Sequence, residues 1–289
     1  LLGEKALASC RLPSTELPRV ASPLSEDWAI LRPSLLPGLL KNAKHNLSRG
    51  ADAVRLFELG KIYRLQGAAV TEHWRVSGLM LGPVLDTRWR PARAPRAGFP
   101  DAKAAVEDLL SRAGTITWAQ LCEPAAGATP CDPLFHPAHA LRALINGLPV
   151  ATVGCLHPRV ARAFDLEREE ALVFEADLEW LAGRENARAR FAAFSCLPVS
   201  RRDLALVLDK AVPFAKVEAV VRACRLPEFK NIQLFDVYEG KGIPDGMKSL
   251  AVRLTFGLSD RTLTDAEIAQ AAETLVSALS RELGAKLRS

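Results

Sequence analysis

Residues 203–288 contain a regular order of strand and helix patterns, and this order constrains the fold more than any other feature of the chain. The clearest strand is predicted at 249–256, where apolar residues occupy every second position, as in a strand with one buried face. The clearest helix begins at Thr264-Asp265-Ala266-Glu267, a capping box in which the Thr hydroxyl and the Glu carboxylate satisfy backbone amides that a helix start leaves free. The predicted elements, in chain order, are a strand at 203–209, a helix at 213–224, strands at 232–238 and 249–256, a helix at 264–283 and an edge strand at 285–288.

This β-α-β-β-α-β order predicts a ferredoxin-like fold, in which four antiparallel strands carry both helices on one face. The other face of such a sheet stays open. Unstacked bases of a single-stranded RNA loop can lie on an open sheet, where they stack on aromatic rings and bond to polar side chains through their edges. The carboxyl-terminal unit, which we place at 194–289, is therefore expected to leave one sheet face open to a partner.

The larger amino-terminal part, which we place at 1–190, mixes strand and helix patterns. Its best signal is Asn146-Gly147 between two apolar stretches, because both residues tolerate the positive φ angles of a type I′ hairpin turn. Residues 1–34 are proline-rich and are expected to be irregular, and the polar stretch 183–190 is expected to be a linker. The other elements predicted here are helices at 35–49, 101–113 and 158–164 and strands at 54–63, 76–81 and 172–178.

The composition excludes several classes of protein. Of the 289 residues, 49% are hydrophobic and 25% are charged, which is ordinary for a globular protein and excludes a disordered or collagen-like chain. No apolar stretch approaches the ~18–20 residues of a membrane-spanning helix, so no membrane association is predicted. The six cysteines form no C-x-x-C pair, and we expect them to be reduced thiols of a cytoplasmic protein. The net charge of +5 permits an anionic partner without identifying one, and a first residue of Leu rather than Met indicates a fragment of a longer protein.

Motifs for phosphate binding or covalent catalysis are missing from the sequence. It contains no G-x-x-x-x-G-K-[ST], no G-x-G-x-x-G and no G-x-S-x-G, and we predict no catalytic residue. The nearest approach to a metal site is the set Cys122, Cys131, His136 and His139. Its cysteine spacing is loose and Pro137 separates the histidines, so a loop entering the hairpin is favoured over a zinc site, and no metal is predicted.

Several segments, taken together and in this order, resemble one known family. The family is the bacterial phenylalanyl-tRNA synthetase β subunit, of which the chain resembles the carboxyl-terminal part. Ser22 stands where the family usually has Asn, and Cys155 where Gly is common. The segments that carry the resemblance lie at 22–26, 31–40, 54–63, 153–158, 198–205, 235–238, 248–251 and 261–265.

The resemblance implies an α+β protein of two domains. Residues 1–190 would form a class II synthetase-like antiparallel sheet domain that docks on the α subunit and has no working site, which agrees with the lack of any Gly-x-Gly-x-Gly segment. Residues 194–289 would form a ferredoxin-fold domain that binds the anticodon loop of phenylalanine tRNA. The implied assembly is a cytoplasmic α2β2 heterotetramer, a ligase in protein biosynthesis that uses ATP and Mg²⁺, neither of which this segment would bind.

The resemblance also implies the RNA-binding residues. Base contacts are expected at Ala205, Asp236, Tyr238 and Ser249. The chemistry of these residues is suitable, since Asp236 can accept hydrogen bonds from the N–H edge of a guanine and Tyr238 offers a ring or a phenol. Basic residues of the same unit are expected to meet phosphates, and these are Arg201, Arg202, Lys248 and Arg253.

Two other readings of the chain remain open. It could be a purely structural scaffold or oligomerisation module whose ferredoxin-like unit packs on protein without RNA contact, which apolar residues on the outer sheet face would favour. It could also be a ferredoxin-type regulatory domain that binds an amino acid, which would require a small-molecule pocket at a sheet edge.

Overall fold

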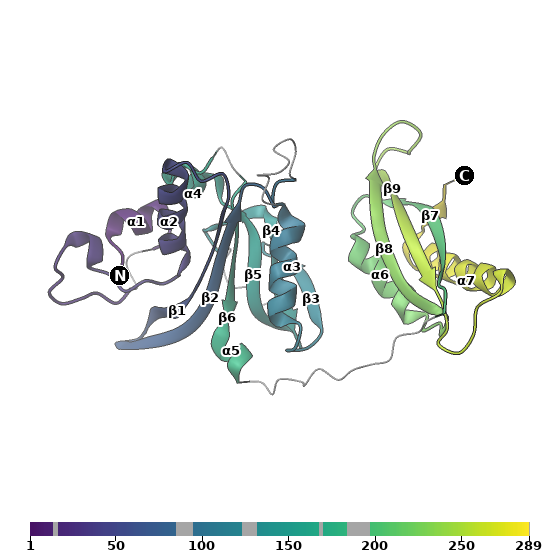
Figure 1. Cartoon of the computed structure of the whole chain (residues 1–289), viewed down its shortest axis with the longest axis horizontal. Coiled ribbons are helices and arrows are strands. Elements are labelled where there is room, and N and C mark those ends of the chain that lie inside the picture. Colours follow the sequence, from purple (N-terminus) through teal and green to yellow (C-terminus); the bar gives the residue numbers. More distant parts are fainter. Residues whose placement is uncertain (14–16, 85–94, 123–131, 168–169, 184–196, 289) are drawn as a thin grey trace. The chain divides into compact units, whose positions relative to one another are not determined.

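A computed structural model describes residues 1–13, 17–84, 95–122, 132–167, 170–183 and 197–288 (Figure 1). Backbone contacts divide the chain into two compact units, Leu1–Arg188 and Ala189–Ser289, and each is described by itself. Nearly all of the stretch expected to be a linker, 183–190, lies outside the described residues.

The first unit is built on a six-stranded antiparallel sheet with the strand order β1-β2-β6-β5-β4-β3. An antiparallel sheet with helices packed on it confirms the α+β class expected for this part of the chain. The strands are β1 (Val54–Gln66), β2 (Ala69–Leu81), β3 (Ile116–Gln120), β4 (Phe135–Ile145), β5 (Leu148–Leu156) and β6 (Leu172–Asp177).

Helices cover both faces of this sheet, which therefore has a hydrophobic core on each side. The longer helices α2 and α3 belong to different cores: Leu40 of α2 packs with Leu79 and Val173, whereas Val106 of α3 packs with Val153 and Phe174. The helical elements of the unit are α1 (Glu4–Ser9), the 3₁₀ turn η1 (Glu26–Trp28), α2 (Leu36–Ser48), α3 (Phe99–Leu110), α4 (Pro158–Ala163) and α5 (Leu178–Ala182). The expectation that residues 1–34 are irregular is wrong at α1, whose Leu7 is fully buried against Leu2 and Ile30 and so gives this short helix tertiary support.

The predicted hairpin is confirmed. Strands β4 and β5 pair across Asn146 and Gly147, whose φ angles are 53° and 77°. Both angles are positive, as a type I′ turn requires, and this turn twists in the sense that joins two antiparallel strands.

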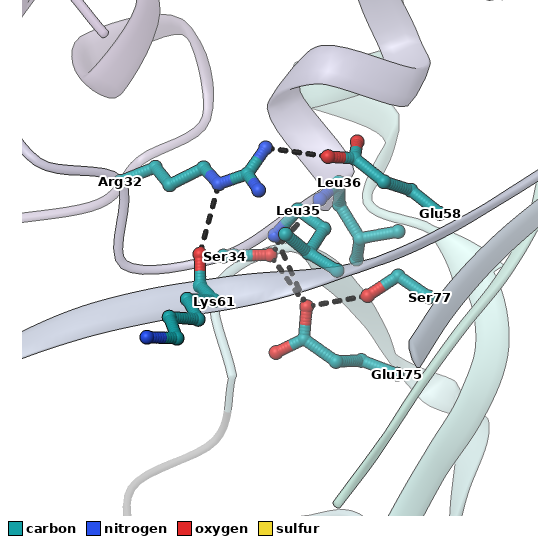
Figure 2. Close-up of polar contacts among 8 residues, drawn as sticks. All are labelled: Arg32, Ser34, Leu35, Leu36, Glu58, Lys61, Ser77 and Glu175. Atoms are coloured by element: carbon teal, nitrogen blue, oxygen red, sulfur yellow. Dashed lines mark hydrogen bonds and ion pairs between the residues drawn. The ribbon is translucent and has the colours of Figure 1, made fainter. Parts of the chain in front are cut away.

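A polar cluster fixes the start of α2 to the sheet, as Figure 2 shows. One Glu175 oxygen of β6 accepts hydrogen bonds from the hydroxyls of Ser34 and Ser77, both at 2.8 Å, and from the Leu35 amide at 3.4 Å. The Ser34 hydroxyl in turn accepts from the Leu36 amide at 3.1 Å. Amides at a helix start lack intrahelical partners, so this carboxylate satisfies the helix end while joining it to β2 and β6.

The second unit has the predicted ferredoxin-like fold. Its sheet has the strand order β10-β7-β9-β8 with every pair antiparallel, and Figure 1 shows α6 and α7 on one face of it. Its core lies between that face and the helices. The elements are β7 (Ser200–Asp209), α6 (Phe214–Ala223), β8 (Phe229–Tyr238), β9 (Met247–Phe256), α7 (Asp265–Leu283) and β10 (Lys286–Leu287).

A β-bulge in β8 changes which side chains reach the open face. Leu234 pairs with Val252 and Asp236 pairs with Ala251, so one extra residue, Phe235, lies between two consecutive pairs. Side chains alternate along a strand, and an extra residue shifts every later side chain to the opposite face. The bulge therefore turns Asp236 and Tyr238 away from the helices, whereas uninterrupted alternation from Leu234 would point both toward them.

The prediction that all cysteines are reduced is wrong at Cys122, which is disulfide-bonded. Cys10, Cys155 and Cys224 have free thiols. Burial raises the pKa of the Cys10 thiol to about 12, so this side chain behaves as a small apolar core residue.

Candidate nucleic-acid interface

The open face of the second sheet presents three rows of side chains that cross β7, β9 and β8 at matching positions. The middle row is small at two of its three positions, which leaves a shallow floor between the outer rows. In strand order, the rows are Asp203–Arg253–Gln233, Ala205–Ala251–Asp236 and Val207–Ser249–Tyr238. This surface is called the open face below.

Asp236 lies at one side of the alanine floor. Its side chain is exposed, and its carboxylate makes no hydrogen bond or ion pair with any residue that the structure describes. A carboxylate in this condition retains both oxygens as acceptors, the arrangement that the paired N–H groups on a guanine edge require.

Tyr238 is 39% exposed and stands beside the same floor. Its hydroxyl donates to the Lys241 carbonyl at 3.2 Å, and the Arg288 guanidinium lies 5.2 Å from its ring centroid. Arg288 is a functional candidate that reading the sequence missed. The predicted edge strand at 285–288 places its backbone, whose amide bonds to Ala205 at 2.8 Å, but no pattern in the sequence indicates how far the side chain reaches.

Ser249 shares a row with Tyr238 but is only 4% exposed. Its hydroxyl has no hydrogen-bond partner among the described residues. Buried hydroxyls in proteins are nearly always bonded, so this one is available to a ligand group that enters the row.

Arg253 is held by the strand opposite it. Its guanidinium donates to both carboxylate oxygens of Asp203, at 2.8 and 2.7 Å. These hydrogen bonds lower the pKa of Asp203 and raise the pKa of Arg253, so the pair stays charged across the physiological range. The same guanidinium lies 5.4 Å from the ring centroid of Phe235, the extra residue of the bulge.

The remaining basic residues divide between the two faces. Arg201 pairs with Thr255 on the open face and has no ion-pair partner within the described residues. Arg202 lies on the helix side, opposite Leu254, and contacts Asp265 at 3.4 Å. Lys248 also lies on the helix side, opposite the buried Leu208, and donates to the Lys210 carbonyl at 2.9 Å. The open face thus brings together six of the eight expected residues, namely Ala205, Asp236, Tyr238, Ser249, Arg201 and Arg253.

The metal-like set of the sequence is not assembled in the described part of the chain. His136 and His139 meet edge to face at 4.6 Å, while Cys131 lies outside the described residues. No group of three or more His, Cys, Asp or Glu side chains within the described ranges is arranged to hold a metal ion. Among the described helices, none combines the length and the apolar character needed to cross a lipid bilayer.

Comparison with known proteins assigns a class to the unit that carries the open face. Residues 195–288 match the family described as a ferredoxin-fold anticodon binding domain. Residues 2–178 match the family described as the phenylalanyl tRNA synthetase beta chain CLM domain. The chain therefore belongs to the phenylalanyl-tRNA synthetase beta-chain family, and the resemblance read from the sequence is confirmed.

Two curated relatives agree with this assignment. The phenylalanine–tRNA ligase beta subunit of Thiobacillus denitrificans is 35% identical over 288 residues, covering 99% of this chain and 34% of the relative. The beta subunit of Xanthomonas axonopodis pv. citri is 36% identical over 275 residues, covering 93% of this chain and 33% of the relative. The chain thus spans about a third of the length of the curated relatives it matches. A solved pyrrolysyl tRNA synthetase from Desulfitobacterium hafniense, 19% identical, covers 63% of this chain and 58% of that chain at a TM-score of 0.43.

Proposed function

We propose that the chain is the carboxyl-terminal part of the β subunit of a phenylalanine–tRNA ligase, and that its open face binds the anticodon loop of phenylalanine tRNA. The proposed division is a docking domain at 1–190 and an anticodon-binding domain at 194–289. The ligase that contains it would be a cytoplasmic α2β2 heterotetramer in which ATP and Mg²⁺ serve the α subunit. This chain would hold the tRNA and the partner without carrying out the chemical step.

One observation carries the RNA-binding half of this proposal: the exposed Asp236 carboxylate has no partner among the described residues and faces outward across the Ala205–Ala251 floor. A base lying on that floor presents its edge to Asp236 and its face to the Tyr238 ring. Stacking supplies affinity for any base, whereas two hydrogen bonds from one base edge to a carboxylate select guanine. Affinity and selectivity would therefore come from different side chains of the open face.

Replacing Asp236 by Asn tests this function. Asn offers one acceptor in place of two, so the preference for guanine should fall, and a bidentate contact to one base edge is worth about 1–3 kcal/mol of discrimination. We expect the wild-type chain to bind an anticodon stem-loop RNA of phenylalanine tRNA more tightly than the same RNA with its anticodon guanine changed to adenine. Asp236→Asn should bring the two affinities together.

Glu273→Gln is the matched control, because Glu273 is an exposed acid on α7, which lies on the other side of the sheet. It removes the same charge and should leave the discrimination unchanged. Equal affinity of the wild-type chain for the two RNAs at fixed salt would refute guanine readout by this face.

An exposed apolar surface on the first unit supports docking on the α subunit. Phe57 and Leu59 of β1 and Trp74 of β2 lie on one face of the β1–β2 hairpin at 71%, 53% and 43% exposure. Helix α3 packs on the same face of the sheet over β5 and β6, and among the described residues its hydrophobic core includes none from β1. β1 is also an edge strand of 13 residues, and monomeric proteins rarely leave such an edge both apolar and uncovered. We propose that the α subunit covers this surface.

A further inference from the structure

The bulge residue Phe235 presents a second aromatic ring on the open face, besides that of Tyr238. This exposed ring is called the platform below. Its side chain is 52% exposed, and the Arg253 guanidinium lies 5.4 Å from its ring centroid. Arg253 is itself fixed by two hydrogen bonds to Asp203. The Asp203–Arg253 pair thus holds one side of the ring, and the large exposed fraction shows that solvent reaches much of the remainder.

A basic hollow adjoins this platform. It has a volume of about 460 Å³ and is lined by Arg201, Arg202, Asp203 and Arg253. Three guanidinium groups against one carboxylate leave the hollow positively charged. Asp203 bonds to Arg253 and Arg202 contacts Asp265, so Arg201 is the guanidinium that is left for an anion.

The Arg253 row, which carries this platform, lies on the other side of the alanine floor from the Tyr238 row. Arg253 lies four residues from Ser249 along β9, which is about 13 Å at the rise of a strand. One base cannot contact both the Tyr238 row and the Arg253 row over that distance. Any RNA that occupies both rows must do so with two different nucleotides.

We propose that Phe235 and the basic hollow form a nucleotide subsite that accepts an unstacked nucleotide of any base type. The base stacks on the exposed ring of Phe235, and a neighbouring phosphate contacts Arg201. The inference rests on the proposed function, since the nucleotide is expected to belong to the same loop whose guanine meets Asp236. It differs from that contact in being blind to sequence, because the Phe235 ring stacks on any base and Arg201 meets a phosphate rather than a base edge.

Phe235→Leu in the full 289-residue chain tests the subsite. The variant keeps an apolar residue in the bulge and removes the ring. Binding is measured by fluorescence anisotropy with the anticodon stem-loop RNA and with its guanine-to-adenine form. Since a base–aromatic stack is worth roughly 5- to 150-fold in affinity, Phe235→Leu should weaken both RNAs by the same factor within that range. Phe235→Trp should restore binding of both.

Two further variants separate stacking from strand geometry and from phosphate contact. Val237→Ala is the matched control, because Val237 is 50% exposed on the same strand but lies on the helix side, and it should bind like the wild type. Arg201→Gln should lower the slope of log affinity against log salt by about 0.7, the contribution of one phosphate contact in a single strand.

The outcomes distinguish the subsite from the proposed function. If Phe235→Leu binds both RNAs as the wild type does, while Asp236→Asn abolishes discrimination, the subsite is refuted and guanine readout stands. If the wild type shows no discrimination but Phe235→Leu weakens both RNAs, the subsite stands and guanine readout fails. A loss confined to the guanine RNA overturns the sequence-blind subsite, because the ring would then be shaping the Asp236 contact.

Discussion

Gly154 of β5 has no space for a side chain. A Cβ there would lie 2.5 Å from the Ala140 Cβ and 2.6 Å from the His139 carbonyl oxygen, because β4 is irregular between Phe135 and Ala140 and presses against β5. Gly38, in the first turn of α2, is different, since its nearest neighbour would be the end of the Glu58 side chain at 3.7 Å.

These two glycines give opposite predictions for the same substitution. Gly154→Ala should lower the free energy of unfolding of the first unit by about 1–3 kcal/mol, the usual cost of overpacking. Gly38→Ala should cause no loss and should add up to about 1 kcal/mol, because Ala restricts the unfolded chain more than Gly does. All five tryptophans lie at or before residue 180, so urea titration followed by tryptophan fluorescence reports this unit. A Gly154→Ala protein as stable as the Gly38→Ala protein would contradict the packing argument.

Helix α7 shows how a short local signal fixes the start of an element. The sequence predicts its capping box, and in the structure the Glu267 carboxylate accepts from the Thr264 amide at 2.8 Å while the Thr264 hydroxyl accepts from the Glu267 amide at 3.4 Å. The Arg261 guanidinium also donates to Glu267, at 2.6 Å. Hydrogen bonds from Arg261 and then from Thr264 lower the pKa of Glu267 from 4.5 to about 2.

This lowered pKa predicts a pH dependence for α7. The unfolded chain binds the proton more tightly than the folded chain, so the stabilising effect of Glu267 is complete above pH 4.5 and declines as the pH falls toward 2. Hydrogen–deuterium exchange at the start of α7 should therefore speed up between these pH values in the wild type, beyond the intrinsic change in exchange rate. Glu267→Gln should show this acceleration already at neutral pH, and Glu273→Gln should match the wild type. Identical protection of Glu267→Gln and wild type at pH 6 would refute the role of the cap.

Strand β8 marks the limit of what local pattern reveals. Alternation from Ile232 and Leu234 points Asp236 and Tyr238 toward the helices, and the bulge that reverses them arises from pairing with β9, which the sequence of β8 alone does not encode. The resemblance to a known family, rather than periodicity, supplied their place on the open face. For Arg202 and Lys248 the signal was present. Each continues an alternation of apolar residues, Leu204-Leu206-Leu208 on β7 and Leu250-Val252 on β9, and this alternation places both on the helix side.

At the scale of the whole molecule, the order and type of elements were predictable because each depends on nearby residues, as the Asn146-Gly147 turn and the α7 cap show. Contacts between segments that are distant in the sequence were not predictable. Neither the disulfide of Cys122 nor the reach of Arg288 to the Tyr238 ring follows from spacing along the chain. The exposure of the apolar face of the β1–β2 hairpin could not be predicted either, because it depends on α3 packing over β5 and β6 instead.

That uncovered face predicts how the chain assembles. Changing Phe57 and Leu59 together to Ser should weaken co-elution with the phenylalanyl-tRNA synthetase α subunit in size-exclusion chromatography, because it removes two exposed apolar side chains from the proposed interface. Leu148→Ser is the control, since Leu148 is equally exposed at 53% but lies at the β4–β5 turn. If the double variant co-elutes as the wild type does while Leu148→Ser does not, the docking surface lies near that turn instead.

The Glu175 cluster has a consequence for how the chain folds while it is being synthesised on the ribosome. Ser34, beside the start of α2, and the carboxylate that holds it are 141 residues apart. At about 5–20 residues per second, translation needs roughly 7–28 s to supply the missing acid after the serine has been made. During that interval the leucines of α2 lack the β6 residues that complete their core. The nascent chain therefore exposes the apolar face of α2, which a chaperone would be expected to shield.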